Sequence, residues 1–375
     1  MNSNYSEKEK TGHDHTTIAG ITFNDILVIV IISFLSGLLI LLPRYTNINP
    51  ADVLFYEKNA ALIAFLGLSL YAVIVKKLFK LEWLLILLGF YIIPAIFINL
   101  LPSDKTSQPI ILACIHLPLL LWCVYGLIYV DFEIRNPMKR VDFIRHNGDM
   151  AILGALLLLA GMILAGFTIG LFSSIDLKIE KFYSEYIAIW GVVAAPAITA
   201  FIIHHYPKLT SKIAPIIATL FSPLVLITLT VYLAAVVFTG KDPYTDRDFL
   251  IMFNLMLVGV MGIIVFSISE ASDERKRRFN EIVLFALSIV TLVTDLVALS
   301  AIFYRLGEFG VTPNRVAVLG SNILVLGNLI LITIDLFKVN FRHGSIEKVN
   351  ITTARYLPAY MLWTIVVVFG FPLIF

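Results

Sequence analysis

Eleven apolar runs of about 20 residues each, separated by short polar loops, constrain this chain more than any other feature. A helix needs about 20 apolar residues to cross a hydrocarbon core about 30 Å thick, because each residue advances it by only about 1.5 Å. With 59% hydrophobic residues and a mean hydropathy of +0.90, the chain cannot hide its apolar side chains in a water-soluble globule. The sequence therefore predicts an all-α, polytopic transmembrane helix bundle. The predicted crossings are residues 26–42, 60–78, 81–101, 109–130, 151–172, 186–206, 213–239, 248–269, 281–303, 315–336 and 356–375.

The Lys and Arg residues fall mostly on alternate loops, and this predicts the orientation of the bundle. If the N-terminus is cytoplasmic, 19 of the 28 Lys and Arg residues lie on the cytoplasmic side and only 9 on the other. Basic loops resist translocation, so we expect a cytoplasmic N-terminus and an exofacial C-terminus. The net charge of +2 is too small to indicate a nucleic-acid partner.

A single membrane domain is expected, because no loop exceeds about 20 residues and none has the composition of an interdomain linker. Residues 1–24 are polar and predict a disordered cytoplasmic tail, and residues 25–375 form the transmembrane domain. No small-residue cleavage site follows the first crossing, so we expect it to stay in the mature protein. The charged loop at residues 131–150 predicts a solvated connector.

Polar residues recur every seven positions on two consecutive crossings, and each set therefore shares one helix face. A connection of only about 11 residues makes these two helices antiparallel neighbours, so we expect the two polar stripes to line one seam. Asp295 is the strongest single candidate for function, because an unpaired charge inside a membrane is costly. The stripes are Glu281, Ser288, Thr291 and Asp295 on the first helix and Ser321, Asn328 and Asp335 on the second.

Depth gives a second constraint on where polar groups gather. His116, Asn254, Asp295 and Asn322 lie six to eight residues from the exofacial ends of their crossings. By the helical rise, all four fall within a layer about 3 Å thick. They predict an exofacial polar cavity. The alternative is that each makes a structural hydrogen bond.

Two charged exofacial loops, residues 241–248 and 305–315, lie above this layer. Thr312 and Pro313 have the pattern of an N-cap followed by the first residue of a helix. Guanidinium groups near a membrane surface bind phosphate or carboxylate, which makes the loop arginines candidate ligand-binding residues. The loop candidates are Arg247, Glu308, Asn314 and Arg315.

The same loops carry a resemblance. The stretch Gly-Lys-Asp-Pro-Tyr-Thr-Asp-Arg-Asp-Phe-Leu at residues 240–250, followed by Phe253-Asn254, and the stretch Arg-Leu-Gly-Glu-Phe-Gly-Val-Thr-Pro-Asn-Arg at residues 305–315 are similar to an uncharacterised family of bacterial multi-pass membrane proteins, domain of unknown function 4153. The resemblance extends from about residue 145 through the tenth crossing and includes Arg145-His146-Asn147-Gly148-Asp149. It implies a bacterial cytoplasmic membrane and brings no reaction or ligand with it.

Three classes of function remain open. The leading hypothesis is a protein that transports or handles a small or lipid-linked ligand, with the polar layer as its site and membrane lipids around it. The alternatives are a membrane scaffold whose buried polar groups only specify packing, and a membrane-embedded enzyme acting on a phosphate-bearing or lipid-linked substrate. No cofactor fingerprint or metal-ligand spacing is present in the sequence, so neither a cofactor nor a metal is expected, and the oligomeric state is left open.

Overall fold

The computed structural model of the chain describes residues 22–46, 48–173, 177–207, 213–239, 244, 254, 257–264 and 274–375. Within these residues every regular element is helical, so the predicted all-α class is confirmed. π-helical segments at Tyr183–Ala188 and Val366–Gly370 join α7 to α8 and α14 to α15. The helices are α1 (Phe23–Ile40), α2 (Leu42–Tyr45), α3 (Phe55–Lys76), α4 (Leu81–Leu100), α5 (Gln108–Tyr129), α6 (Pro137–Ser173), α7 (Glu180–Phe182), α8 (Ile189–His205), α10 (Ile213–Thr239), α12 (Glu274–Phe309), α13 (Pro313–Phe341), α14 (Ile346–Ile365) and α15 (Phe371–Ile374), and residues 257–264 are helical as well.

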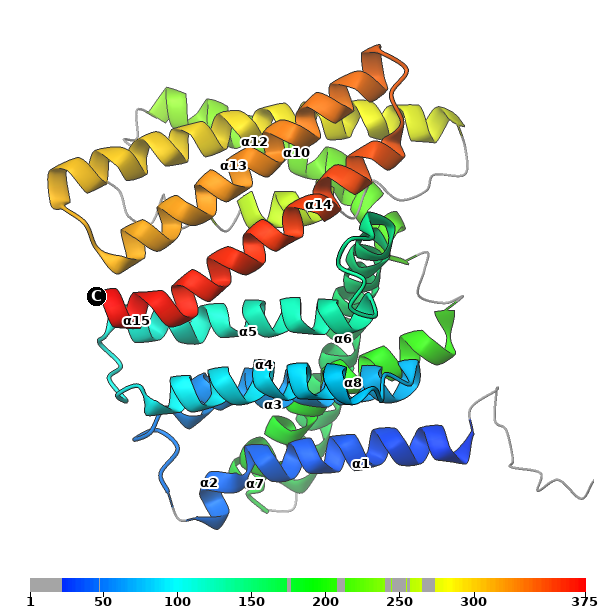
Figure 1. Ribbon diagram of the computed structural model, residues 1–375, viewed down its shortest axis with the longest axis vertical. Helices are drawn as coiled ribbons and strands as arrows, with labels where there is room; N and C mark the ends of the chain where they lie inside the picture. Colours follow the sequence, from blue (N-terminus) through cyan, green and yellow to red (C-terminus); the bar gives the residue numbers. More distant parts are fainter. Residues whose placement is uncertain are drawn as a thin grey trace, which may run out of the picture.

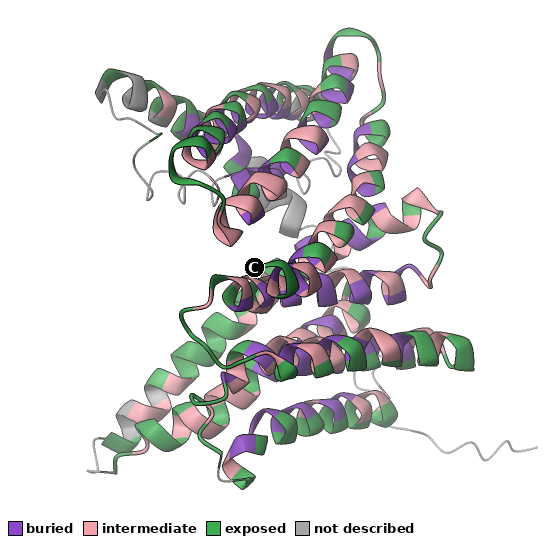
Figure 2. Ribbon diagram, turned by 60° about the vertical axis from the view of Figure 1, so that its left-hand side comes forward, coloured by how far each residue is buried: buried purple, intermediate pink, exposed green. Residues whose placement is uncertain are grey.

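Nine helical segments among the described residues are long and apolar enough to cross a membrane. They correspond to the first six and the last three predicted crossings. The seventh predicted crossing is α10, and most of the eighth lies outside the described residues. Large apolar side chains are exposed along the outer faces of the helices, while the buried residues face inward (Figure 2). The chain is therefore a multi-pass integral membrane protein, and the count of eleven crossings stays a prediction.

The helices form two packed groups, and α14 contacts both of them (Figure 1). In one group α1, α3, α4, α5 and α8 surround a buried apolar cluster that includes Leu117 and Ile128. In the other, α10, residues 257–264, α12 and α13 surround a second cluster that includes Leu284 and Leu329. Because α14 packs on α13 as well as on α5 and α6, it lies at the junction of the two groups.

Two glycines allow aromatic side chains of α14 to lie directly on α13. A Cβ atom on Gly320 would collide with the ring of Trp363, and one on Gly327 would collide with the hydroxyl of Tyr356. The two glycines are seven residues apart, so they lie on the same face of α13. This face sets how closely α14 approaches α13.

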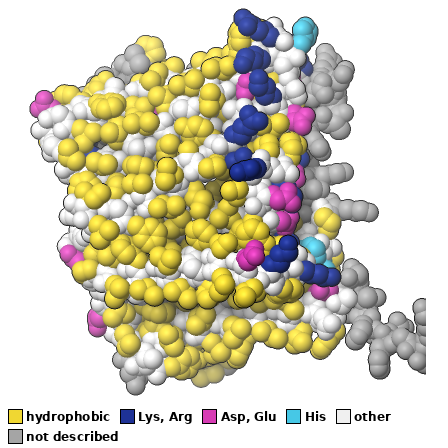
Figure 3. Space-filling model, in the orientation of Figure 1, with side chains coloured by type: hydrophobic (Ala, Val, Ile, Leu, Met, Phe, Trp, Pro, Cys, Tyr) yellow, Lys and Arg dark blue, Asp and Glu magenta, His cyan; other side chains and the backbone are white. Residues whose placement is uncertain are grey.

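Lys and Arg side chains gather along one edge of the bundle, on the right in Figure 3. We call this the basic edge. Contacts between helix ends agree with alternating helix directions. The end of α8 meets the start of α1, where His205 and Asp25 lie 3.5 Å apart. The end of α13 meets the start of α12, where Arg278 donates to Asn340 O over 3.0 Å. The basic edge is the one predicted to be cytoplasmic.

Several helices extend beyond the predicted crossings, and the largest difference is in α6. This helix begins at Pro137, so most of the loop predicted as a solvated connector at residues 131–150 is helical. Val141, Phe143 and Ile144 are buried there, which explains why the segment folds onto the bundle. The prediction missed this because it placed helix ends at the ends of the apolar run.

The start of α1 also lies earlier than predicted. Thr22 and Asp25 form a capping box, in which the Thr22 side chain accepts from Asp25 N and the Asp25 carboxylate accepts from Thr22 N. Residues 22–24 therefore belong to the helix and its cap. Residues 1–21 of the predicted tail lie outside the described residues.

Candidate functional site

A cavity of about 340 Å³ lies at the junction of the two helix groups. It is enclosed by α5, α6, residues 257–264, α13 and α14, and most of its lining is apolar. Leu119 and Val258 line the cavity and are also 48% and 65% exposed, so it reaches the apolar outer surface between α5 and residues 257–264. Along α13 the lining runs from Ser321 to Asn328, which is about 10 Å by the helical rise.

Asn328 is the polar side chain of the cavity that is least satisfied. It is 1% exposed, and its amide nitrogen donates to the Tyr360 hydroxyl over 3.1 Å. Its Oδ1 atom is buried and accepts no hydrogen bond from any described residue. A buried carbonyl without a donor is costly, so the cavity wall holds an unsatisfied acceptor, which neighbouring atoms cover.

The other polar side chains that line the cavity are mostly bonded within the protein. The Ser321 hydroxyl accepts from Trp363 Nε1 over 3.0 Å, and Asn147 Oδ1 accepts from Trp122 Nε1 over 2.9 Å. His116 Nδ1 lies 2.9 Å from Leu112 O. A carbonyl can only accept, so the proton is on Nδ1 and the neutral ring has Nε2 as an acceptor.

The predicted depth layer is partly assembled. Asn322 Nδ2 donates to Asn254 Oδ1 over 2.8 Å, so two of the four residues are in direct contact. His116 lines the same cavity as Ser321, the neighbour of Asn322 in sequence. The four residues of the layer come from four crossings, and three of these line the cavity: α5, residues 257–264 and α13. The fourth, α12, contributes no lining residue. The cavity also extends toward the basic edge, where Asn147 and Thr353 line it.

Asp295, on α12, is fully buried. Neither of its carboxylate oxygens has a hydrogen-bond partner among the described residues. Ser288 and Thr291 share its face and are also fully buried, as predicted, but their hydroxyls donate to the α12 carbonyls of Phe285 and Leu287. Asp295 does not line the cavity.

The polar stripe of α13 was predicted to face α12. In the structure it faces α14 instead. Ser321 and Asn328 bond to α14 as described above, and Asp335 Oδ2 accepts from the Thr352 hydroxyl over 2.6 Å. Asp335 also lies 3.6 Å from Lys338 Nζ and 3.9 Å from Lys348 Nζ. The two helices α12 and α13 are neighbours, as predicted. The seven-residue spacing identified the polar face of α13 correctly but did not determine which neighbour it meets.

Three of the four loop candidates, Glu308, Asn314 and Arg315, are among the described residues, at the edge opposite the basic edge, and no hydrogen bond or ion pair joins these three. Arg315 Nη1 donates to the carbonyl oxygens of Phe309 and Gly310 over 2.7 and 2.6 Å, so this guanidinium caps the end of α12. Asn314 is half-buried and Glu308 is exposed, and neither makes a polar side-chain contact with a described residue. Arg247 lies outside the described residues.

The helix start next to these candidates follows the sequence prediction. Thr312 is the N-cap of α13, with its hydroxyl accepting from Arg315 N over 3.4 Å, and Pro313 is the first helical residue. Both predictions are confirmed.

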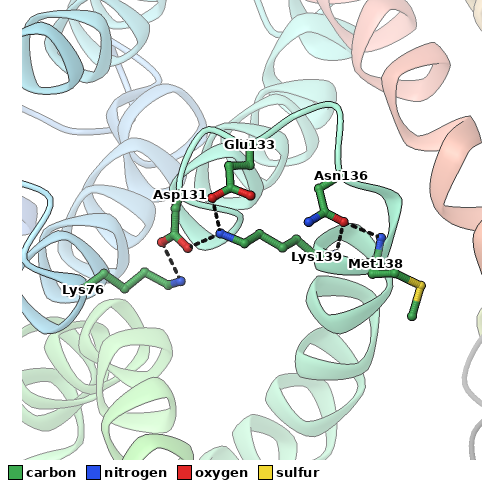
Figure 4. Close-up of polar contacts among 6 residues, drawn as sticks. All are labelled: Lys76, Asp131, Glu133, Asn136, Met138 and Lys139. Atoms are coloured by element: carbon green, nitrogen blue, oxygen red, sulfur yellow. Dashed lines mark hydrogen bonds and ion pairs between the residues drawn. The ribbon is translucent and has the colours of Figure 1, made fainter.

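The basic edge holds a network of ion pairs that the sequence analysis did not identify. Asp131 lies 2.8 Å from both Lys76 Nζ and Lys139 Nζ, and Lys139 also lies 2.8 Å from Glu133 (Figure 4). Burial favours the neutral form of Asp131, but the hydrogen bonds from Lys139 and Lys76 outweigh it and hold the pKa of this carboxyl below its ordinary value. The network joins the end of α3 to the start of α6.

No family model matches the chain, and neither a curated protein nor a solved structure matches it. The resemblance to the bacterial membrane-protein family therefore stays a prediction, and the function has to be argued from the cavity and the side chains around it.

Proposed function

We propose that this membrane protein binds and handles a lipid-like ligand, whose apolar chain occupies the cavity at the junction of the two helix groups. The observation that carries the proposal is an apolar, elongated cavity whose wall holds a buried and unused acceptor, Asn328 Oδ1. Ligand sites are typically apolar clefts of about 300–1,000 Å³ with a few polar groups that fix orientation. A cavity of about 340 Å³ lies at the lower end of this range.

The shape of the cavity favours a chain over a compact solute. Its lining extends from Thr353 to Thr364 on α14, about 16 Å along the helix axis. Its opening, next to Leu119 and Val258, is on the apolar surface, where the surrounding solvent is lipid. Once the Asn328 side chain turns toward the cavity, a hydroxyl or amide group of the ligand would donate to its Oδ1 atom and remove the cost of leaving that oxygen unsatisfied.

Photochemical crosslinking tests this proposal. A phospholipid with a diazirine in its acyl chain is incorporated into vesicles with the protein, and crosslinked peptides are mapped by mass spectrometry. We expect labelling of Asn328 or Tyr360, which face the cavity, and a several-fold loss of this labelling in Leu119→Trp, because the larger indole closes the opening.

Ile115→Trp is the matched control for that experiment. Ile115 lies one turn from Leu119 on α5 and is 58% exposed, but it does not line the cavity. This variant should label like the wild type. Equal labelling of the Asn328 and Tyr360 peptides in both variants would show that the lipid chain does not enter the cavity.

A scaffold is the second candidate, and one observation favours it. The polar side chains of α13 that meet α14 are bonded to protein partners, which is what a role in helix packing requires. A scaffold needs no unused acceptor in its cavity. Absence of cavity labelling together with an intact fold would therefore support this alternative.

Movement of the ligand would make the protein a transporter and would require a coupling group. Asp295 is the candidate for that role, because it is fully buried and has no hydrogen-bond partner among the described residues. The resemblance of the loops supports a bacterial cytoplasmic membrane as the location.

A further inference from the structure

His116, on α5, leaves one ring nitrogen free to bind a ligand. The proton on Nδ1 is directed at Leu112 O, so Nε2 can only accept a hydrogen bond. Nε2 makes no hydrogen bond with a described residue and is not fully covered by neighbouring atoms. Because His116 lines the cavity, Nε2 is the accessible acceptor of its wall on α5.

Ser321, on α13, lies at the same level of the cavity as His116. Leu112, one helical turn before His116, and Ala317, one turn before Ser321, belong to one apolar cluster together with Trp363. Both helices begin at the edge opposite the basic edge and run in the same direction (Figure 1). One turn further along each helix, His116 and Ser321 both line the cavity. The Ser321 hydroxyl accepts from Trp363 Nε1 and donates to no described residue, so its own proton is left to donate.

A hydroxyl is the ligand group that matches these two side chains, because it donates one hydrogen bond and also accepts. A phosphate or carboxylate only accepts, and it would leave His116 Nε2 without a partner. None of the described residues that line the cavity is Lys, Arg, Asp or Glu. A charged ligand group would therefore be buried there without a counter-ion, which is costly.

The position of the opening also selects against a charged ligand. Leu119 lies about 15 Å from either end of α5 by the helical rise, so the opening is near the middle of that helix. Val258 lies in the middle of the predicted crossing at residues 248–269, and residues 249–269 contain no Lys, Arg, Asp or Glu. A charge at the middle of a membrane is costly, so a charged headgroup stays at the surface. A lipid without charge can enter the cavity whole.

We infer that the cavity binds an uncharged long-chain alcohol, whose hydroxyl donates to His116 Nε2 and accepts from the Ser321 hydroxyl. The inference rests on the proposed function, because the chain of the alcohol occupies the same cavity, and it specifies the polar group of the ligand. The two side chains remove the cost of burying a hydroxyl in apolar surroundings. The chain would extend from them along the apolar lining toward Thr353 at the other end.

Crosslinking with three single-chain amphiphiles tests the inference. They are a long-chain alcohol, its methyl ether and its phosphate ester, each with a diazirine next to the polar end of an identical chain. Labelling of the peptides that contain Ser321 or Trp363 is compared in vesicles with the same molar content of each. A hydrogen bond of ordinary strength corresponds to about 5-fold in affinity, so the alcohol should label about 5-fold more than the ether. The phosphate ester should label less than the alcohol by roughly 10-fold or more, because its charge has no counter-ion in the cavity.

Three variants locate the hydroxyl site. His116→Phe removes the acceptor but keeps a ring, and it should lower labelling by the alcohol to the level of the ether. His116→Gln keeps an acceptor and should retain part of the difference, which separates loss of the acceptor from damage to the fold. His204→Phe is the matched control, since it is the same change at an exposed position outside the cavity, and it should label like the wild type. Elution on size exclusion monitors the fold of each variant.

The outcomes separate this inference from the proposed function. Labelling that Leu119→Trp blocks but that is equal for the alcohol and the ether, or a difference that survives His116→Phe, would overturn the hydroxyl site and leave the cavity intact. Stronger labelling by the phosphate ester than by the alcohol would overturn the uncharged ligand. Loss of labelling by the alcohol in excess free glycerol would overturn a lipid as the source of the hydroxyl. Labelling insensitive to Leu119→Trp would overturn the proposed function itself.

Discussion

The two buried aspartates on neighbouring helices differ in one respect that determines their contribution to stability. Asp335 has two lysines and a threonine hydroxyl within reach, whereas Asp295 has no partner among the described residues. Removing a charge that is paired leaves its partners unsatisfied, but removing one that is unpaired relieves a desolvation cost. The same substitution at the two positions should therefore have opposite effects.

We expect Asp295→Asn to leave the stability of the protein unchanged or raise it by up to about 2 kcal/mol, and Asp335→Asn to lower it by about 1–3 kcal/mol. Thermal midpoints in detergent, followed by tryptophan fluorescence, measure both effects. Comparable destabilisation by the two variants would mean that Asp295 is held by bonds that fix the fold. That result would mean that Asp295 stabilises helix packing and does not couple ligand movement.

For single residues, the sequence predicted the depth of a side chain in the membrane where the helical rise alone determines that depth. Asn254 and Asn322 were matched by depth, and they are in contact. For Arg315 we considered only a ligand and did not anticipate the bonds to the terminal carbonyls of α12, which also needed donors.

At the scale of helices, the approach of α14 to α13 depends on residues that lack a side chain. Gly320→Ala would force the ring of Trp363 to move, and this ring also donates a hydrogen bond to Ser321. Overpacking of this kind costs about 1–3 kcal/mol. We expect a lower thermal midpoint and weaker labelling of the cavity, because Ser321 and Trp363 both line it.

Gly307→Ala on α12 is the comparison for that variant. A Cβ atom there meets no neighbour within 4 Å, so the change should be neutral or stabilise the helix by up to about 1 kcal/mol. If both alanines had the same effect, the contact between Trp363 and α13 would not limit the packing. The seven-residue spacing identified the polar face of α13, but spacing along one helix contains no information about which neighbour packs on it.

At the scale of the whole molecule, the fold class was the most predictable feature, because it follows from the apolar composition of the chain. Nine of the eleven predicted crossings coincide with described helices that are long and apolar enough to cross a membrane. The distribution of Lys and Arg predicted one basic edge, which Figure 3 shows. The division into two helix groups was not predicted, and neither was the part of the cavity lined by α6 and α14, since both depend on contacts between helices distant in sequence.

The orientation itself can be tested by labelling from one side of the membrane. Cys114 and Cys123 are the only cysteines, so replacing both with serine gives a background for single-cysteine variants. Arg135→Cys lies between α5 and α6 at the basic edge, and Lys105→Cys lies between α4 and α5 at the opposite edge. We expect a membrane-impermeant maleimide to label Lys105→Cys in intact cells, and Arg135→Cys only after permeabilisation, because basic loops are retained in the cytoplasm. The reverse pattern would place the basic edge on the outer side of the membrane and overturn the predicted orientation.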